Sequence, residues 1–242
     1  MSVLDQARVL AALDATWPAA RMIEAGPWSL REGRGGGQRV SAATANQAVA
    51  ERDIAIAEDG MRALGQRPLF MIRQGETHDA WLDAQGYDIV DPVTLYMAET
   101  SALAQPLKLT SAIPSWPPLA VQLDLWADGG IDAPRISVRE RATGDKTSIL
   151  GRHGDTPGGT VFVAAKGDIA MFHALEVAPA ERRNGIGRIL VTATANWAKS
   201  MGARWLTLAV TTANRPANSL YKTMGMTAVG GYHYRRAPEG KA

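Results

Sequence analysis

Residues 169–190 read IAMFHALEVAPAERRNGIGRIL, and this stretch decides the fold. The run 169–177 is apolar on both faces, which predicts a strand buried within a sheet. After a short loop, apolar residues recur every three or four positions, which predicts one long amphipathic helix. Its apolar stripe comprises Ile186, Ile189, Leu190, Ala193, Trp197, Ala198 and Met201. The sequence therefore predicts a strand that leads through a tight turn into a helix.

The turn between this strand and this helix is a predicted phosphate-binding site. The first N–H groups of a helix have no partner inside it, and the helix dipole adds partial positive charge there. Gly185 and Gly187 add no side chain that would hold a phosphate away, and Arg182, Arg183 and Arg188 bring positive charge to the same turn. Because the third glycine of a dinucleotide fingerprint and the Gly-Lys-Ser/Thr ending of a P-loop are both missing, neither of those sites is predicted.

The spacing of residues in this stretch is more specific than the two glycines alone. Val177, Pro179, Arg182, Gly185 and Gly187 stand at V-x-P-x-x-R-x-x-G-x-G. This pattern closely resembles the GNAT superfamily of acyl-CoA-dependent N-acyltransferases. Downstream, NRPANSLYKTMGM resembles that family's N-x-x-A-x-x-L-Y-x-x-x-G-F element, with methionine in place of the final aromatic residue. Two motifs in the family's order favour a GNAT fold over a helix start that merely contains glycines.

The resemblance implies acetyl-CoA, a coenzyme A thioester, as the cofactor. Its pantetheine arm is expected between two splayed parallel strands, which end at Val177 and Val210 and leave backbone groups free to pair with the ligand's amides. The residues expected at the cofactor are Leu175, Glu176, Val177, Arg182, Arg183, Asn184, Gly185, Ile186, Gly187, Arg188, Asn214 and Tyr221. A backbone N–H near Val177 is expected to hold the oxyanion.

His173 and Glu176 are the candidate bases, because attack on a thioester needs a neutral amine. His173 matches a strand position where some GNAT enzymes carry a base, and a hydrogen-bonded core histidine is the alternative. Strict alternation places His173, Leu175 and Val177 on one face and Glu176 on the other, which favours a structural partner such as an arginine for Glu176. A water relay could replace either residue.

Tyr221 is the predicted acid, because the family's matching tyrosine protonates or steadies the departing thiolate. Packing is the alternative, since Tyr221 shares an apolar helical face with Leu220 and Met224. Asn214 stands at the start of the same helix and is predicted to be its N-cap. The resemblance implies that this asparagine also contacts the cofactor or the cleft.

The first half of the chain contains a second strand–helix–strand plan. Residues 65–73 predict a strand and residues 78–97 a helix, a glycine stop and a strand, as residues 202–210 and 214–235 do later. Matching glycines of the two plans are almost equally spaced, which indicates two related halves. The domains expected are a degenerate GNAT-like copy, residues 1–104, and a catalytic GNAT domain, residues 105–242. The boundary falls in a proline-containing stretch.

The remaining elements complete an α+β fold with a mixed central sheet, an α/β arrangement of GNAT type. Helices are predicted at 116–131 and 134–142, and strands at 147–151, 159–165 and 168–177. The Gly-rich run 26–45 favours a hairpin turn over a phosphate loop, because no strand-to-helix context surrounds its glycines.

Composition limits the remaining function classes. The chain has 26 Lys and Arg residues and 24 Asp and Glu residues, a formal net charge of +2. This balance of charges argues against a protein whose surface binds nucleic acid or membranes generally through positive charge. The absence of cysteine excludes disulfides, thiolate metal ligands and a cysteine nucleophile. The four histidines, His78, His153, His173 and His233, are scattered, so no metal site is predicted.

The sequence as a whole predicts an N-acetyltransferase that moves an acetyl group to a primary amine of a small molecule or peptide by direct attack. The alternative is an inactive acyl-CoA-binding or regulatory module. No signal peptide or membrane span is recognised, so a cytoplasmic protein is expected, with a homo-oligomer left open. Hypothetical acceptor contacts, for each of which packing is the favoured interpretation, are Trp116, Trp126, Tyr232, His233 and Tyr234.

Overall fold

The computed structural model describes residues 4–239, which form two compact units. The first unit contains the N-terminal residues through Trp17, Leu95–Val210 and Asn214–Gly230, and the second contains Pro18–Thr94, Thr211–Ala213 and the residues from Gly231 onward. Strands β5 (Asp88–Glu99) and β11 (Thr227–Arg236) each contribute to both units. The units therefore do not follow the predicted division at residue 105.

The first unit contains the part β5–β10–β9–β8–β7–β6 of an eight-stranded sheet, which continues beyond β5 with β11 and then β4 (Leu69–Arg73). Its remaining strands are β6 (Ala112–Ser115), β7 (Lys146–His153), β8 (Thr156–Lys166), β9 (Ile169–Val177) and β10 (Trp205–Thr211). Strands β6 to β9 pair antiparallel, whereas β9 and β10 run parallel, with Trp205 opposite Ile169. The mixed central sheet expected from the sequence is confirmed.

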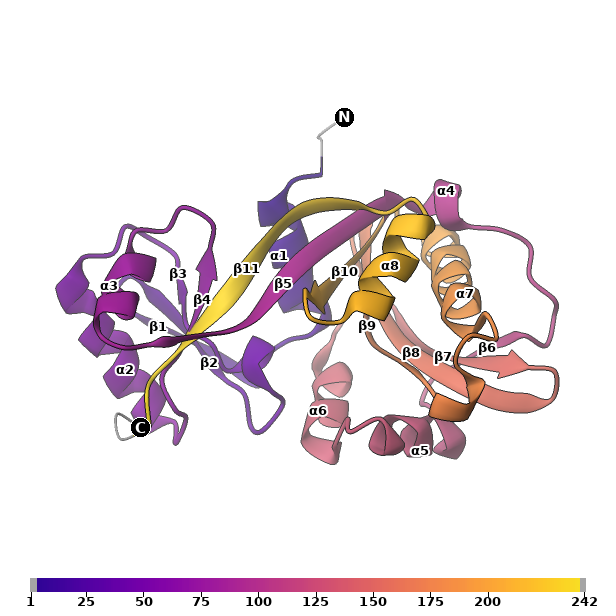
Figure 1. Cartoon of the computed structure of the whole chain (residues 1–242), viewed down its shortest axis with the longest axis horizontal. Coiled ribbons are helices and arrows are strands. Elements are labelled where there is room, and N and C mark those ends of the chain that lie inside the picture. The colour runs from indigo at the N-terminus through magenta and orange to yellow at the C-terminus, as the bar shows by residue number, and fades with distance from the viewer. Residues whose placement is uncertain (1–3, 240–242) are drawn as a thin grey trace. The chain divides into compact units, whose positions relative to one another are not determined.

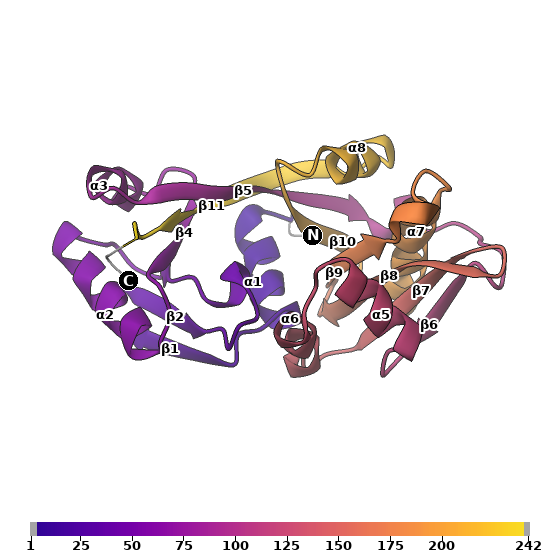
Figure 2. The same ribbon diagram turned by 60° about the horizontal axis from the view of Figure 1, so that its bottom comes forward.

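Helices cover both faces of this sheet (Figures 1 and 2). They are α1 (Gln6–Thr16), α4 (Thr100–Leu103), α5 (Ala120–Asp128), α6 (Ala133–Val138), α7 (Ile186–Ser200) and α8 (Arg215–Thr223). Alternation along β8 separates the two faces: Val161 and Val163 join the core under α7, while Phe162 lies 6.0 Å from the ring of Trp17, directly after α1. Strands β8 and β9 are thus packed by α7 on one side and by α1 and α5 on the other.

Helix α7 forms where the apolar stripe predicts it. Its buried surface is wider than that stripe, because Val191, Thr194 and Ala195 are buried as well. The helix ends before Gly202, which has φ +79°, a conformation that costs glycine little. Met201 falls beyond the helix and is 41% exposed, so it does not belong to the buried face.

The second unit has a three-stranded sheet of order β1–β2–β3. The strands and helices of this unit are β1 (Arg21–Ala25), β2 (Trp28–Glu32), β3 (Thr44–Ala45), α2 (Ile54–Ala63), β4 (Leu69–Arg73) and α3 (His78–Ala84). Strands β2 and β3 pair antiparallel across the Gly-rich segment, with Trp28 opposite Ala45. The hairpin expected for residues 26–45 is therefore confirmed, and only the short 3₁₀ turn Gln38–Val40 follows its glycines.

The helices of the two halves end in the same way. Gly65, Gly86, Gly202 and Gly225 follow α2, α3, α7 and α8, and all have φ between +69° and +85°. After each, the next residue donates its N–H back to the carbonyl five positions earlier, as the 3.0 Å bond from Met226 N to Tyr221 O illustrates. The strand–helix–strand plan inferred from the sequence is present in both halves.

The closing strands of the two plans explain why no single cut separates the units. Strand β5 follows α3, but its end Leu95–Glu99 lies in the first unit, next to β10. Strand β11 follows α8, but its end pairs antiparallel with β4 in the second unit, with Tyr234 opposite Met71. Each half thus pairs the end of its last strand with a strand of the other half, within one eight-stranded sheet.

Candidate active site

Strand β9 carries a bulge at Ala174. Its pairing with β8 shifts there, because Phe162 faces His173 while Thr160 faces Glu176. One extra residue of β9 is therefore accommodated between these two pairs. Ala174 has φ +51°, a left-handed conformation that is uncommon for a residue other than glycine.

The bulge changes which side chains of β9 share a face. Phe172 before it and Leu175 and Val177 after it all pack on the core under α7. His173 and Glu176 face away from that core, toward α1 and α5. The prediction that they lie on opposite faces was wrong, because an extra residue resets the two-residue period of a strand.

Tryptophan 126 of α5 holds the bulge from the same side. Trp126 is 1% exposed, and its indole Nε1 donates a 2.7 Å hydrogen bond to the carbonyl oxygen of Ala174. Near it, the buried Gln122 donates to Thr160 Oγ1 at 3.1 Å and ties α5 to β8. Helix α5 thereby supports the strand at the point where its register shifts.

His173 is a buried histidine with a hydrogen-bond partner. Its ring stacks on Trp17 at 4.9 Å between centroids, and its Nε2 lies 2.8 Å from Thr16 Oγ1. The Thr16 hydroxyl donates its own proton to Ala12 O at 2.7 Å, so it accepts from His173 and Nε2 carries a proton. The basic lone pair of the ring is then on Nδ1, and because His173 is only 3% exposed, its surroundings are those of a core histidine.

Glu176 keeps partial access to solvent. Its side chain is 20% exposed, and Oε1 accepts from Arg182 Nη2 at 3.4 Å, so an arginine is indeed its partner. The contact is long and the side chain of Arg182 is 58% exposed, so this ion pair contributes little to the stability of the fold. Gly129, just after α5, makes room for Glu176, because a Cβ there would lie 2.6 Å from Glu176 Cγ.

The turn before α7 exposes backbone donors. Gly185 caps the helix with φ +81°, no side chain caps it, and the N–H groups of Ile186, Gly187 and Arg188 have no acceptor within the helix. A Cβ on Gly185 would meet nothing within 4 Å, whereas one on Gly187 would lie 3.0 Å from Leu220 Cδ2. Gly185 therefore faces open space, while Gly187 packs closely against Leu220 of α8.

Polar contacts hold the loop that leads into this turn. Asn184 Nδ2 donates to Glu181 Oε2 at 3.1 Å, and His153 Nδ1 lies 3.2 Å from the same oxygen. Arg182 Nε donates to Val177 O at 3.2 Å and connects the loop to the end of β9. Arg183 is exposed beside them, so cationic side chains stand around the exposed backbone donors.

Tyr221 packs against β9 from α8. It is 4% exposed, and its ring lies 5.8 Å from Phe172 and 6.0 Å from Tyr96. Burial raises the pKa of its phenol well above the ordinary 10.0, so the hydroxyl stays protonated at neutral pH. No described residue makes a hydrogen bond with that hydroxyl. Asn214 caps α8 as expected, with Oδ1 accepting from Ala217 N at 3.2 Å.

The description that fits this arrangement is "Acetyltransferase (GNAT) family", whose family pattern matches residues 113–226. Residues 113–226, a little less than half of the chain, are similar to that family. The match covers both predicted motifs, the bulged strand β9 and helices α7 and α8.

A curated relative and a solved structure are also similar to this chain. The chain is 34% identical over 119 residues to streptothricin acetyltransferase of Streptomyces lavendulae, across 49% of this chain and 62% of that protein. The chain thus spans less than two thirds of that curated relative. A GCN5-related N-acetyltransferase from Kribbella flavida has the same fold, with a TM-score of 0.72 at 19% identity over 97% of this chain and 96% of that one.

A tandem GNAT protein from the clavulanic acid biosynthesis pathway is also similar in fold. Its TM-score is 0.56 at 14% identity, over 82% of this chain and 76% of that one. The family model and the curated relative that the chain resembles are both acetyltransferases, and the two solved structures share its fold.

Three of the hypothetical acceptor contacts lie outside the GNAT match, in the second unit. Tyr232 and Tyr234 are buried there with their rings 5.3 Å apart, and His233 Nε2 lies 3.1 Å from Asp79 Oδ1. These contacts fit the packing interpretation. Within the matched residues 113–226, Trp126 is buried and Trp116 is 39% exposed.

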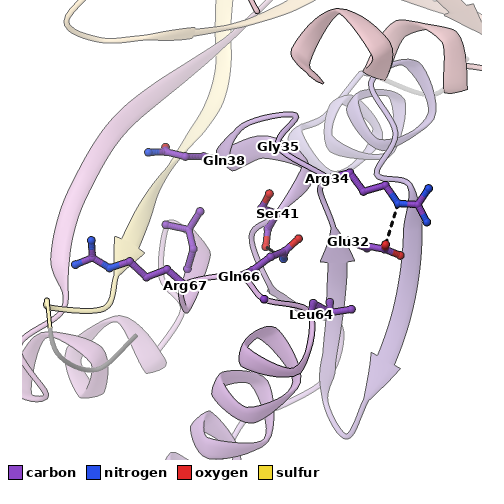
Figure 3. Close-up of a pocket in the computed structure, with 10 residues that line it drawn as sticks. Glu32, Arg34, Gly35, Gln38, Ser41, Leu64, Gln66 and Arg67 are labelled. Atoms are coloured by element: carbon purple, nitrogen blue, oxygen red, sulfur yellow. Dashed lines mark hydrogen bonds and ion pairs between the residues drawn. The ribbon is translucent and has the colours of Figure 1, made fainter. Parts of the chain in front are cut away.

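The second unit contains a separate cavity of about 430 Å³ (Figure 3). Ser41 and Gln66 are among the residues that line it, and Gln66 Nε2 donates to Ser41 O at 3.3 Å. Arg34 and Arg67 line it as well, with Arg34 paired to Glu32. Its lining includes none of the predicted site residues of the GNAT domain.

Residues 4–239 contain no cluster of three or more His, Asp or Glu side chains that could hold a metal ion. None of their helices has the length and apolar character that crossing a bilayer requires.

Proposed function

We propose that this protein is an N-acetyltransferase that moves an acetyl group from acetyl-CoA to a primary amine by direct attack. The observation that carries the proposal is the uncapped start of α7, which faces open space at Gly185 and directly follows the bulged strand β9. A pyrophosphate fits there, because oriented N–H groups and the helix dipole both favour an anion.

The residues around this turn suit the other parts of acetyl-CoA as well. Backbone groups of Leu175 and Val177 would hold the pantetheine arm, and the N–H groups of Ile186 to Arg188 would hold the pyrophosphate. Arg183 and Arg188 are exposed and add positive charge at the turn. When bound, acetyl-CoA supplies the thioester whose acyl carbon the amine attacks.

The side chains divide the proton transfers between them. Glu176 accepts the proton that the attacking amine loses, directly or through a water. A backbone N–H near Val177 donates to the carbonyl oxygen as it gains charge. Tyr221 donates its proton to the thiolate sulfur as the C–S bond breaks. His173 supports the strand and does not transfer protons in this scheme.

A thiol-release assay tests the proposal. The protein is mixed with acetyl-CoA and a panel of primary amines that includes streptothricin, and free coenzyme A is followed with time. We expect saturable release that depends on one or more amines, together with acetylated amine by mass spectrometry. Tight acetyl-CoA binding by calorimetry with no acetylated amine would instead favour the inactive acyl-CoA-binding module.

Changing Tyr221 to Phe should lower kcat by about 100-fold and leave the KM for acetyl-CoA nearly unchanged. The substitution removes a proton donor but keeps the ring that packs on Phe172. Tyr96→Phe is the matched control, because Tyr96 donates to Asn218 Oδ1 at 3.1 Å and is given no part in the reaction. Equal rates for the Tyr221 variant and the unaltered protein would reject the acid role.

We also propose that the first half of the chain is a degenerate copy of the GNAT fold. The matching glycine-terminated helices of the two halves support it, as does the reciprocal placement of β5 and β11. In this proposal the copy serves as a scaffold. Acetyl-CoA binding at one site per chain in calorimetry is the expected result, and two equivalent sites would contradict it.

A further inference from the structure

The C-terminal end of α5 contacts strand β9 at two points around its bulge. Trp126 Nε1 donates to Ala174 O at 2.7 Å, and three residues later Gly129 lies against Glu176, the proposed base. Residues three apart lie on the same face of a helix, so both contacts come from one side of α5. Figure 2 shows this helix beside β8 and β9. One end of α5 thus touches both the backbone of the bulge and the side chain that follows it.

The bulge needs such support, because its backbone is strained. Ala174 has φ +51°, a left-handed conformation that is unfavourable for a residue with a Cβ. Residues keep such a conformation only where their surroundings hold them in it. The hydrogen bond from the Trp126 indole reaches the carbonyl of this same residue. It therefore acts on the peptide unit at which the strain lies.

The indole is itself fixed in place. Trp126 is 1% exposed, and the buried guanidinium of Arg139 lies 4.9 Å from the centre of its ring, whose face attracts the positive charge. One turn earlier on α5, the fully buried Gln122 donates to Thr160 Oγ1 at 3.1 Å. Thr160 is the partner of Glu176 across the β8–β9 pairing. The helix that carries the indole is therefore tied to the strand beside the bulge.

Gly129 leaves the space that the Glu176 side chain occupies. A Cβ at this glycine would lie 2.6 Å from Glu176 Cγ and 2.7 Å from its Cδ, too close for either atom to stay where it is. The backbone of Gly129 has φ −78°, which any residue adopts, so the contact with Glu176, and not the backbone, opposes a larger residue. The end of α5 thus limits where the carboxylate of Glu176 can lie.

The orientation of the peptide between Ala174 and Leu175 affects two groups of the proposed site. In a trans peptide the C=O and the N–H point in opposite directions, so a hydrogen bond that fixes Ala174 O also fixes the N–H of Leu175, whose backbone we place at the pantetheine arm. Glu176 is the next residue, and a rotation of this peptide moves its carboxylate. A displacement of about 1 Å near the reacting groups is enough to cost about 100-fold in rate.

We propose that Trp126 is a positioning residue for acetyl transfer. Its hydrogen bond to Ala174 O holds the bulge in the form that places Glu176 beside the attacking amine, in the space that Gly129 leaves free. The proposal rests on the proposed acetyl transfer and adds to it a residue that takes no part in proton transfer itself.

Trp126→Phe tests this role, because phenylalanine fills most of the ring space but has no N–H to donate. We expect kcat to fall by about 10- to 100-fold at saturating acetyl-CoA and amine. Trp28→Phe is the matched control: Trp28 is also fully buried and donates from Nε1 to a backbone carbonyl, Asp53 O, at 2.7 Å, but it lies in the second unit. Both variants should lose similar Tm, and only Trp126→Phe should lose kcat.

Rescue by glycine separates positioning from general destabilisation. Glycine adopts φ +51° without strain, so Ala174→Gly should keep the form of the bulge when the indole donor is absent. We expect kcat of the double variant Trp126→Phe/Ala174→Gly to lie within about 3-fold of kcat for Ala174→Gly alone. A tryptophan that merely fills space would give the same loss in both backgrounds.

Gly129→Ala tests the same geometry from the side chain of the base. The added methyl should displace Glu176 and lower kcat by about 10-fold, with the backbone of α5 unchanged. In the Glu176→Gln background neither Gly129→Ala nor Trp126→Phe should lower kcat further, because the group that they position is already lost. Losses that multiply in that background would mean that these residues act elsewhere, and would reject the proposal.

The outcomes also separate this proposal from the proposed function. Equal kcat for Trp126→Phe, Trp28→Phe and the unaltered protein would overturn the positioning role while acetyl transfer stands. If the unaltered protein acetylates no amine, acetyl transfer is rejected, and amide hydrogen exchange over residues 172–177 decides whether the indole holds the bulge. Faster exchange in Trp126→Phe than in Trp28→Phe would keep that part of the proposal, and equal exchange would reject it as well.

Discussion

Replacing Glu176 by Gln should lower kcat for acetyl transfer by about 100- to 1,000-fold, which is the range expected when a general base is lost. Glutamine keeps the size of the side chain and can still accept from Arg182, but it cannot take up the amine proton. The space next to Gly129 stays filled, so the fold should be unaffected. Steady-state kinetics at saturating acetyl-CoA, together with Tm, measure the two effects separately.

His173→Gln is the comparison that gives the Glu176 result its meaning. His173 donates to Thr16 and stacks on Trp17, so this substitution should lower Tm while changing kcat by less than about 10-fold. The opposite pattern, a large loss of kcat in His173→Gln and little in Glu176→Gln, would assign the base to the histidine. Full activity in both variants would point to a water relay that needs neither side chain.

Gly185→Val should raise the KM for acetyl-CoA by about 100-fold or more. Valine is strained at φ +81°, and a left-handed conformation costs roughly 1–2 kcal/mol for a residue with a Cβ. The added side chain would also enter the open space in which we place the pyrophosphate. A 100-fold effect corresponds to about 2.7 kcal/mol, which we ascribe to the lost phosphate contacts, whereas the backbone strain lowers stability.

Gly202→Val is the matched control at the other end of the same helix. Gly202 has φ +79°, and a Cβ there likewise meets nothing within 4 Å. Both variants should therefore lose similar stability, but only Gly185→Val should lose affinity for acetyl-CoA in calorimetry. An equal loss of affinity in both would show that α7 is merely destabilised and that the phosphate does not bind at its start.

The elements nearest the two motifs were predictable because their signals are local. The strand 169–177, the helix from Ile186 and the N-cap Asn214 follow from periodicity and capping, which act over a few residues. Helix α1 was not predicted, although Asp5, whose side chain accepts from Arg8 N at 2.9 Å, is a recognisable N-cap. This omission mattered, because Thr16 at the end of α1 is the partner of His173.

The bulge at Ala174 could not be predicted from the alternation of side chains along a strand. No glycine or proline marks the position, and the left-handed φ of an alanine has no local sequence signal. Trp126 supports it from a segment far away along the chain. The sequence likewise did not predict that Nε and Nη1 of Arg139 are buried without a hydrogen-bond partner among the described residues, because this depends on every neighbour that packs around the side chain.

The sequence by itself determined that a strand runs through a glycine-containing turn into a long helix, and that this plan carries GNAT motifs. Such features depend on contacts within one turn of helix or one step of a strand. Only the tertiary structure decided that His173 and Glu176 share a face and that the Thr16 hydroxyl is the hydrogen-bond partner of His173. It also decided that the last strand of each half pairs with a strand of the other half. These outcomes depend on pairing and packing between residues far apart in the chain, and no local pattern specifies such partners.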